Sequence, residues 1–252
     1  MIKKKTIIAG GSGFLGRTLI KCFGPDHEIV VLGRQAADMV EARVVVWDGR
    51  TVGDWAQELE GADALINLAG RSVNCRYNAS NQRTVMNSRL ESTRALGEAI
   101  NRCSNPPKVW LNSSTATIYE HTYGPAHDEL GETGAHPDAK DAFSIEVARA
   151  WEQEFENAKT PATRKVILRT AMVFGAEEGG VFHIMRRLTR LGLGGKMGHG
   201  RQYMSWLHAT DFCRAIEWLM NNSEAEGIYN LSAPHPLSNA EMMSEFRKAY
   251  GM

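Results

Sequence analysis

Short apolar runs rich in β-branched residues recur along the chain and alternate with longer amphipathic stretches. Seven of these runs predict β-strands: KTIIAG, HEIVVLG, ARVVVWD, DALINLAG, PKVWLNSS, RKVILRT and GIYNLSA. Because their apolar residues are nearly continuous, we expect strands that are buried on both faces, as in a parallel sheet.

Helix-like stretches separate the strands, most clearly at residues 83–101, 140–158 and 211–221. This alternation indicates right-handed βαβ units, so we predict an α/β fold with a Rossmann-type doubly wound parallel sheet. After about residue 175, Gly- and Pro-rich connections break the pattern. We therefore assign residues 1–175, with a late strand near 228–231, to the main domain. Residues 176–252 are expected to form a smaller, interleaved C-terminal lobe on the substrate side.

Composition and charge narrow the range of functions. Lys and Arg together number 29 and balance 29 Asp and Glu, so there is no electrostatic footprint for nucleic acid or an anionic membrane. The cysteines lack CxxC or paired His spacing, which favours free thiols over a metal site; they are Cys22, Cys75, Cys103 and Cys213. No apolar run approaches the roughly 18 residues of a membrane span, and no signal peptide is evident. We expect a soluble, cytoplasmic protein.

A glycine-rich loop follows the first predicted strand in IIAGGSGFLGRTLI. A dinucleotide pyrophosphate needs backbone N–H groups at a helix N-terminus and no Cβ in the way, and glycines supply both. A tight structural turn is the alternative, but the strand before the loop and the amphipathic helix after it favour a dinucleotide site. The expected contacts are Gly10, Gly11, Ser12, Gly13, Phe14, Leu15 and Gly16.

The second predicted strand ends in VVLGR, which bears on the choice of cofactor. An NAD site usually has Asp or Glu at this place for the ribose 2′-OH, whereas an NADP site favours Arg for the 2′-phosphate. Arg34 occupies the place, and Gly33 lets the backbone approach. The sequence therefore predicts NADP as the cofactor.

These motifs resemble those of the short-chain dehydrogenase/reductase superfamily, specifically its extended branch of nucleotide-sugar epimerases and dehydratases. NLAG (67–70) is similar to that branch's adenine- and ribose-side motif, and LRTAMVFG (168–175) to its motif near the nicotinamide. SSTATIYE (113–120) is similar to its SSxxVYG motif, with Glu120 replacing the usual Gly. The resemblance implies further cofactor contacts from Leu68, Ala69, Gly70, Ser113 and Val173.

Three other stretches resemble the atypical subgroup called epimerase-family or YfcH-like proteins; they are NSRLESTRAL, EVARAWE and GLGGKMGHGRQYMSWLHATD. The likeness covers essentially the whole chain. Members of the subgroup typically continue for several dozen residues past the position of Met252, so we expect the C-terminal lobe to lack a segment. The resemblance also implies that Arg89 contacts the cofactor phosphate or ribose, and the alternative is an ion pair with a local acid.

The proton-handling residues of the superfamily are only partly matched. Its enzymes use a Ser or Thr hydroxyl to orient the substrate oxygen, a Tyr to transfer the proton and a Lys to lower the Tyr pKa. Thr115 matches the hydroxyl position. The Tyr and Lys positions hold Phe143 and Val147 or, shifted by one, Ser144 and Ala148.

The helix around these positions also has a simpler interpretation. Phe143, Val147, Trp151 and Phe155 recur every four residues, which predicts a packing stripe.

Tyr119 and His208 are the further catalytic candidates that we retain. Tyr119, His121 and Tyr123 follow the fifth strand, where substrate loops usually lie, but a loop-anchoring or exposed group is the alternative for each. His208 belongs to the subgroup motif, and the alternative is a hydrogen-bonded packing residue. Thr210 or Asp211 is expected to cap the helix that follows.

We therefore expect an NADP(H)-binding, atypical short-chain dehydrogenase/reductase-like protein, an oxidoreductase or epimerase-type enzyme acting on an unknown small molecule. The alternative is a cofactor-binding sensor or scaffold without chemistry. The missing Tyr–Lys pair favours the sensor, whereas the retained hydroxyls and the glycine-rich loop at 192–200 favour the enzyme. A nucleotide-sugar epimerase fits the fold but lacks the base. The sequence leaves homodimer formation open.

Overall fold

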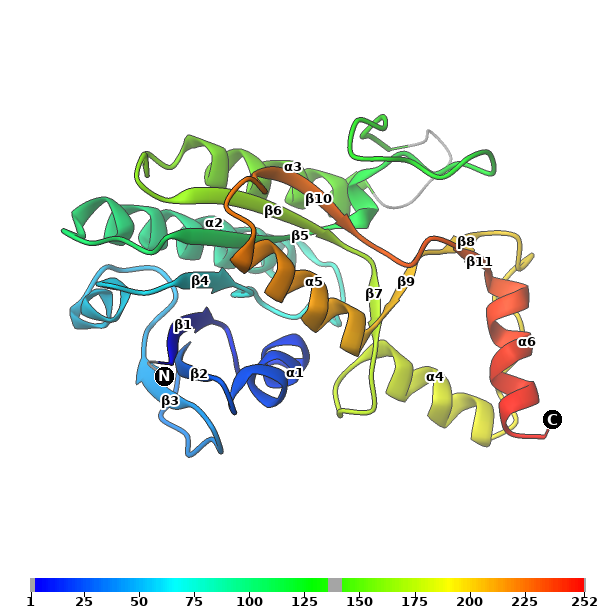
Figure 1. Cartoon of the computed structure of the whole chain (residues 1–252). Helices are drawn as coiled ribbons and strands as arrows, with labels where there is room; N and C mark the ends of the chain where they lie inside the picture. Colours follow the sequence, from blue (N-terminus) through cyan, green and yellow to red (C-terminus); the bar gives the residue numbers. More distant parts are fainter. Residues whose placement is uncertain (1–2, 136–141, 252) are drawn as a thin grey trace.

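A seven-stranded parallel sheet forms the centre of the computed structural model, which describes residues 3–135 and 142–251 (Figure 1). The sheet order is β10–β6–β5–β4–β1–β2–β3, and every neighbouring pair is parallel. The seven predicted strands are all present, as β1 (Lys4–Ala9), β2 (His27–Gly33), β3 (Arg43–Val46), β4 (Ala64–Asn67), β5 (Val109–Thr115), β6 (Arg164–Thr170) and β10 (Gly227–Leu231). The predicted Rossmann-type doubly wound sheet is confirmed.

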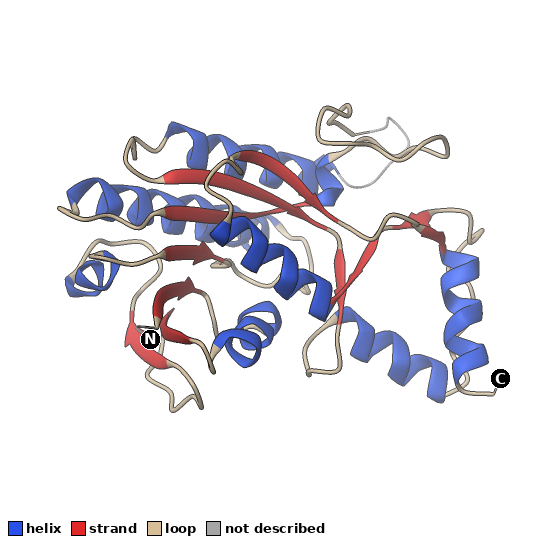
Figure 2. Ribbon diagram, in the orientation of Figure 1, coloured by secondary structure: helices blue, strands red, loops and turns tan. Residues whose placement is uncertain are grey.

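Helices cover both faces of this sheet (Figure 2). Helices α1 (Phe14–Phe23) and α5 (Ala209–Asn221) pack on one face, and α2 (Ala79–Arg102) and α3 (Ala142–Asn157) on the other, together with the short helix η1 (Asp54–Leu59). Helix α2 begins four residues before the predicted start because Asn78 caps it and accepts a hydrogen bond from the Asn81 amide. Residues 140–141 of the helix predicted at 140–158 lie outside the described residues.

Two apolar cores lie between the sheet and its helices. On the α1 and α5 face, Leu19 and Phe212 are among the fully buried side chains. On the other face, the Phe155 ring of α3 meets Trp110 of β5 edge-on, with 4.6 Å between ring centroids. Burying one such side chain contributes roughly 1.5–3 kcal/mol.

The predicted packing stripe of α3 is confirmed. Val147, Trp151 and Phe155 are buried, and Phe143 is half-buried against the Tyr77 ring, with 5.3 Å between centroids. Helix α3 therefore uses this face for packing.

A smaller lobe lies beyond one end of the sheet, with the C-terminus at its far side (Figure 1). It contains α4 (Val181–Arg190), α6 (Asn239–Ala249) and the short strands β7 (Met172–Phe174), β8 (Tyr203–Met204), β9 (Trp206–His208) and β11 (Leu237–Ser238). Its core is rich in Met and Phe side chains: Phe174, Met185, Met204, Met242, Met243 and Phe246. Two elements of region 176–252, α5 and β10, return from the lobe to the main sheet.

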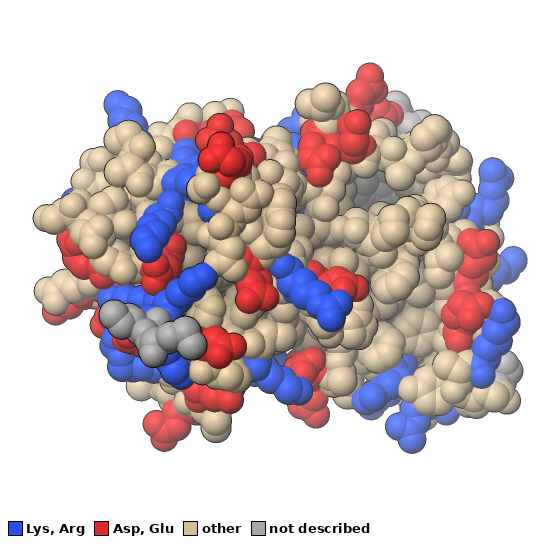
Figure 3. Space-filling view, viewed as in Figure 1, with Lys and Arg blue, Asp and Glu red and all other residues tan. Residues whose placement is uncertain are grey.

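Acidic and basic side chains are interspersed on the face shown in Figure 3. Among residues 3–135 and 142–251, no helix is both long and apolar enough to cross a membrane. The same residues contain no group of three or more His, Cys, Asp or Glu side chains that could hold a metal ion.

The α3 stripe allows a matched test of packing. Phe155→Ala removes a ring that is 1% exposed, so we expect a loss of about 3–5 kcal/mol in the free energy of unfolding. Phe143→Ala removes the half-buried ring of the same stripe and should cost clearly less. Urea denaturation measures both losses, and equal losses would show that the Trp110–Phe155 contact is not a centre of the core.

Candidate functional site

The carboxyl ends of the central strands form one edge of the sheet. Ala9, Leu32, Asn67 and Asn112 are aligned across neighbouring strands. The residue that follows each of these four therefore lies at the same height along the edge of the sheet; these residues are Gly10, Gly33, Leu68 and Ser113. Because strand order reverses between β1 and β4, this edge is where an open parallel sheet binds ligands.

Glycines are required where the chain turns from β1 into α1. Gly10 has a φ of +78°, and a Cβ there would lie 2.8 Å from the Ala69 Cα at the end of β4. A Cβ on Gly16 would lie 2.3 Å from the Gly11 carbonyl oxygen. The loop therefore packs backbone against backbone, which only glycine permits at these two positions.

The N-terminus of α1 has no side-chain cap. Gly13 is its extended N-cap residue, with φ −75° and ψ 177°, and the first turn contains no acidic residue. Ser12 and Gly13 are exposed, whereas Phe14 and Leu15 are half-buried. The first-turn N–H groups and the positive end of the helix dipole thus have neither a side-chain cap at Gly13 nor an acidic residue in the first turn. A phosphate of a dinucleotide fits this arrangement.

A buried amide network fixes the end of β4 opposite this loop. The Asn67 side-chain NH₂ group donates to the Asn112 Oδ1 at 2.7 Å and to the Thr93 Oγ1 at 3.2 Å. The Asn67 Oδ1 accepts from the Ala69 amide at 3.0 Å, and the Trp151 indole donates to Thr93 at 2.9 Å. The network therefore ties the predicted Leu68, Ala69 and Gly70 segment to β5, α2 and α3.

Arg34 follows Gly33 at the end of β2 and is exposed. The Gly33 carbonyl accepts from the Trp47 amide at 2.8 Å, which fixes the backbone there. In the part of the chain that the structure describes, the Arg34 guanidinium has no hydrogen-bond or ion-pair partner. In the register of β1 and β2, Gly33 lies beside Gly10, so Arg34 is one residue further along the chain. This position agrees with a contact to a 2′-phosphate.

Arg89 on α2 lies against Gly70. Its Nη1 donates to the Val85 carbonyl at 3.0 Å and to the Arg71 carbonyl at 3.2 Å, and its guanidinium lies 5.1 Å from the Trp151 ring centroid. Burial lowers the Arg89 pKa, although an Arg stays charged at neutral pH. No ion pair joins Arg89 to a carboxylate among the described residues, so the alternative of a local acid gains no support.

Thr115 is the last residue of β5 and caps η2 (Ala116–Ile118). Its Oγ1 accepts from the Thr117 amide at 3.2 Å and lies 3.0 Å from the Thr117 hydroxyl. The register pairs Thr115 with Thr170 at the end of β6. The Thr115 hydroxyl is thus held at the carboxyl edge, two residues past the half-buried Ser113.

Val173 and His208 lie on the neighbouring strands β7 and β9. Val173 pairs with Leu207 and is buried, whereas His208 is exposed. The His208 Nδ1 accepts from the Thr210 amide at 3.2 Å, so His208 itself caps α5. The predicted cap at Thr210 or Asp211 was wrong because the helix starts immediately after β9. A neutral His208 ring therefore has its proton on Nε2.

A buried ion pair behind this edge was not predicted from the sequence. Arg169 of β6 donates to both carboxylate oxygens of Glu152 on α3, at 3.0 and 2.8 Å. The two side chains are 6% and 8% exposed. Burial alone would lower the Arg169 pKa, but the hydrogen bonds to Glu152 and Tyr119 raise it, so the guanidinium stays charged.

The ion pair extends into a network that includes Tyr119. The Tyr119 hydroxyl accepts from Arg169 Nη1 at 2.9 Å and donates to the Asn230 Oδ1 at 2.7 Å. Ser114 donates to the Glu152 carboxylate. The sequence shows Arg169 as a charged residue within the apolar run RKVILRT, but it does not indicate that Glu152 is its ion-pair partner.

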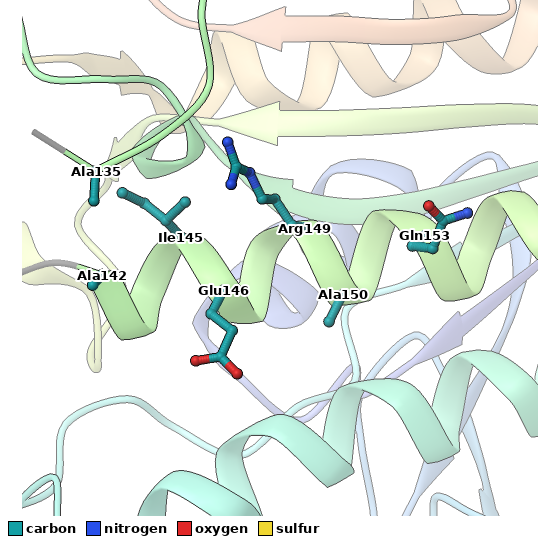
Figure 4. Close-up of a pocket in the computed structure, with 7 residues that line it drawn as sticks. All are labelled: Ala135, Ala142, Ile145, Glu146, Arg149, Ala150 and Gln153. Atoms are coloured by element: carbon teal, nitrogen blue, oxygen red, sulfur yellow. The ribbon is translucent and has the colours of Figure 1, made fainter.

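A separate hollow of about 530 Å³ lies along the outer side of α3 (Figure 4). Ile145, Glu146, Arg149, Ala150 and Gln153 of that helix line it, with Ala135 and Ala142. None of the predicted site residues lines this hollow, so the carboxyl edge remains the candidate site.

Comparisons with known proteins agree with this geometry. Residues 6–232 match the NAD dependent epimerase/dehydratase family. An epimerase family protein of Staphylococcus saprophyticus is 34% identical over 234 residues, which cover 92% of this chain and 76% of that protein. Epimerase family protein SDR39U1 of Bos taurus is 30% identical over 253 residues, covering 98% and 79%. The crystal structure of human SDR39U1 (isoform 2) with NADPH has a TM-score of 0.85 at 30% identity, covering 98% and 80%.

The Gly10 turn can be tested with a matched pair of glycines. Gly10 and Gly49 have φ values of +78° and +81°, but only Gly10 has atoms within 4 Å of an added Cβ. Gly49→Ala should cost about 1–2 kcal/mol of stability from backbone strain alone. Gly10→Ala should cost about 1–3 kcal/mol more from overpacking and weaken dinucleotide binding at least about tenfold. Thermal unfolding and calorimetric titration measure the two effects. Identical behaviour of both variants would contradict the proposed crowding.

The Glu152–Arg169 pair should behave as a coupled unit. Removing one partner leaves a buried charge, so Glu152→Leu and Arg169→Met should each cost about 3–5 kcal/mol in the free energy of unfolding. The double variant should lose much less than the sum of the two single losses. Denaturant unfolding of all four proteins gives the coupling energy, and strictly additive losses would rule out the interaction.

Proposed function

Because the chain belongs to the NAD dependent epimerase/dehydratase family, we propose that it binds NADP(H) in preference to NAD(H) and acts on a small molecule as an atypical oxidoreductase or epimerase-type enzyme. The observation that supports this best is the uncapped N-terminus of α1 directly after the crowded Gly10 turn. The NADPH in the human SDR39U1 structure supports the choice of cofactor.

Two cations at the edge of the sheet support a ligand with several phosphates. Arg34 and Arg89 have no carboxylate partner among the described residues. They lie beside β2 and β4, on either side of the Gly10 turn. Arg34 would contact the 2′-phosphate, and Arg89, which lies against Gly70, would contact the ribose or a phosphate.

The chain supplies a hydroxyl for the chemistry. A bound nicotinamide dinucleotide supplies or accepts a hydride. Thr115 is placed at the carboxyl edge to donate a hydrogen bond to a substrate oxygen, because its Oγ1 already accepts from the Thr117 amide. That hydrogen bond would orient the oxygen and stabilise charge that develops on it.

Tyr119 and His208 are the proposed sources of a proton. The Tyr119 hydroxyl is bonded to Arg169 and Asn230, so proton transfer by Tyr119 requires a substrate group to displace Asn230. His208 is exposed, and in its neutral form it presents an Nε2–H that can donate. Of the two, His208 needs the smaller rearrangement.

A non-catalytic NADP(H)-binding sensor or scaffold is the second candidate function. The sequence resemblance supports it: on α3, the places of the Tyr–Lys pair match Phe143 and Val147 or, shifted by one residue, Ser144 and Ala148. General acid–base catalysis commonly contributes about 10²–10⁴-fold, and none of these four side chains can supply it. The same observation argues against a nucleotide-sugar epimerase.

We expect NADPH to bind about ten- to a hundredfold more tightly than NADH, because a charge-assisted contact from Arg34 to the 2′-phosphate contributes about 1.5–3 kcal/mol. Calorimetric titration of both cofactors measures the preference. Arg34→Ala should remove it, whereas Arg102→Ala, an exposed Arg at the end of α2, should leave it unchanged. A preference that persists in Arg34→Ala would show that another residue selects the cofactor.

We expect tight NADPH binding with slow turnover. A panel of aldehydes, ketones and nucleotide sugars should oxidise NADPH little or not at all, because α3 lacks the usual proton relay. If a compound does react, its turnover should fall in Thr115→Ala and in His208→Ala. Thr115→Ser keeps a hydroxyl and should retain the turnover that Thr115→Ala loses. Absorbance at the NADPH band follows the reaction. Rapid turnover that neither substitution affects would place the chemistry elsewhere.

A further inference from the structure

Two segments that are far apart in the sequence are joined by side-chain contacts. One is residues 119–124, which follow η2; the other is residues 196–203, which lead into β8 (Figure 1). The Tyr123 hydroxyl lies 3.4 Å from the His199 Nε2, and the Arg201 guanidinium lies 5.0 Å from the Tyr123 ring centroid. His121 meets the Tyr123 ring edge-on, with 4.8 Å between centroids. We call these four residues the Tyr123 cluster.

The hydrogen bonds of the cluster leave donors that face outward. The His199 Nδ1 accepts from the Arg201 amide at 3.0 Å, so the neutral His199 ring has its proton on Nε2. This N–H donates to the Tyr123 oxygen, over a long distance. The Tyr123 O–H proton then has no acceptor within residues 3–135 and 142–251.

Arg201 is oriented but has no ionic partner. Stacking on the Tyr123 ring restricts its guanidinium plane and leaves the N–H edge available for a planar or tetrahedral anion. No described carboxylate forms an ion pair with it. The two segments together contain four basic or imidazole residues and one acid; they are His121, Lys196, His199, Arg201 and Glu120.

The cluster is not a buried packing unit. The Tyr123 side chain is 51% exposed, and His121, His199 and Arg201 are exposed as well. An apolar core therefore does not explain why these polar rings and a guanidinium gather here.

Both segments lie close, along the chain, to the proposed catalytic residues. Segment 119–124 begins with Tyr119 and follows η2, which Thr115 caps. Segment 196–203 is followed by β9, which ends at His208.

We propose that the Tyr123 cluster binds an anionic group of the substrate, a carboxylate or a phosphate, and so selects acids or phosphate esters. This inference rests on the proposed function, because it assumes that the substrate lies at the carboxyl edge. Arg201 supplies the charge and the paired N–H donors, and Tyr123 supplies the outward O–H.

Anion titrations test the cluster directly. The ¹⁵N-labelled protein, with NADPH bound, is titrated at constant ionic strength with inorganic phosphate and separately with succinate. The imidazole signals are followed by NMR and assigned with His121→Asn and His199→Asn. We expect saturable shifts of both rings with at least one probe, and the stronger probe identifies the anion class.

Substitutions separate the cluster from general surface charge. Arg201→Ala should weaken binding of the anion about tenfold or more. Arg201→Lys should weaken this binding less, because Lys keeps the charge but loses the planar array of N–H donors. Tyr123→Phe keeps the ring but removes the hydroxyl, so it should also weaken binding of the anion. The control Arg102→Ala should leave this binding unchanged. Shifts that do not saturate with either probe, or equal affinity in wild type and Arg201→Ala, would overturn the proposal.

Failure of the proposed function gives a different result. If the wild-type protein does not bind NADPH, the cofactor assignment fails, and the same titrations on the cofactor-free protein still test the cluster. If NADPH binds and neither anion does, only the Tyr123 cluster proposal fails.

Discussion

The close approach of Gly10 to the Ala69 backbone is the constraint on which the candidate site depends. A Cβ on Gly10, just after β1, would lie 2.8 Å from the Ala69 Cα, two residues after β4, and β1 and β4 are the strands between which strand order reverses. The chain can then turn directly into α1, so the uncapped end of that helix faces the edge of the sheet. The buried Asn67 network holds β4 in place against this turn.

A second constraint holds the other half of the edge. The Glu152–Arg169 pair joins α3 to β6, and its hydrogen bonds to Ser114 and Tyr119 extend to β5 and the segment beyond it. Thr115 lies next to Ser114, so its position depends on this pair. On α3, Val147, Trp151 and Phe155 pack in the core, and Glu152 forms this buried ion pair.

The sequence predicted the sheet and the glycine loop well because both depend on local patterns. Seven apolar runs became seven strands, and the strand–glycine–helix order placed Gly10 at the turn. The sequence did not predict α4, which is flanked by glycine-rich loops and has two of its five apolar side chains, Ile184 and Leu188, exposed. It also missed Glu152 and Arg169, since a buried pair is defined by a contact between elements. The Tyr123 cluster was missed for the same reason: its two segments are 72 positions or more apart in the sequence.

Hydrogen–deuterium exchange with and without NADPH tests the central claim most directly, because it reports on the backbone N–H groups that are proposed to bind the pyrophosphate. The account predicts slower exchange on NADPH binding in peptides that cover residues 10–17 and 67–71, at the two sides of the Gly10 turn. The peptides along the outer side of α3, around residues 145–153, should not change. Protection of the α3 peptides with no change at residues 10–17 would contradict the account.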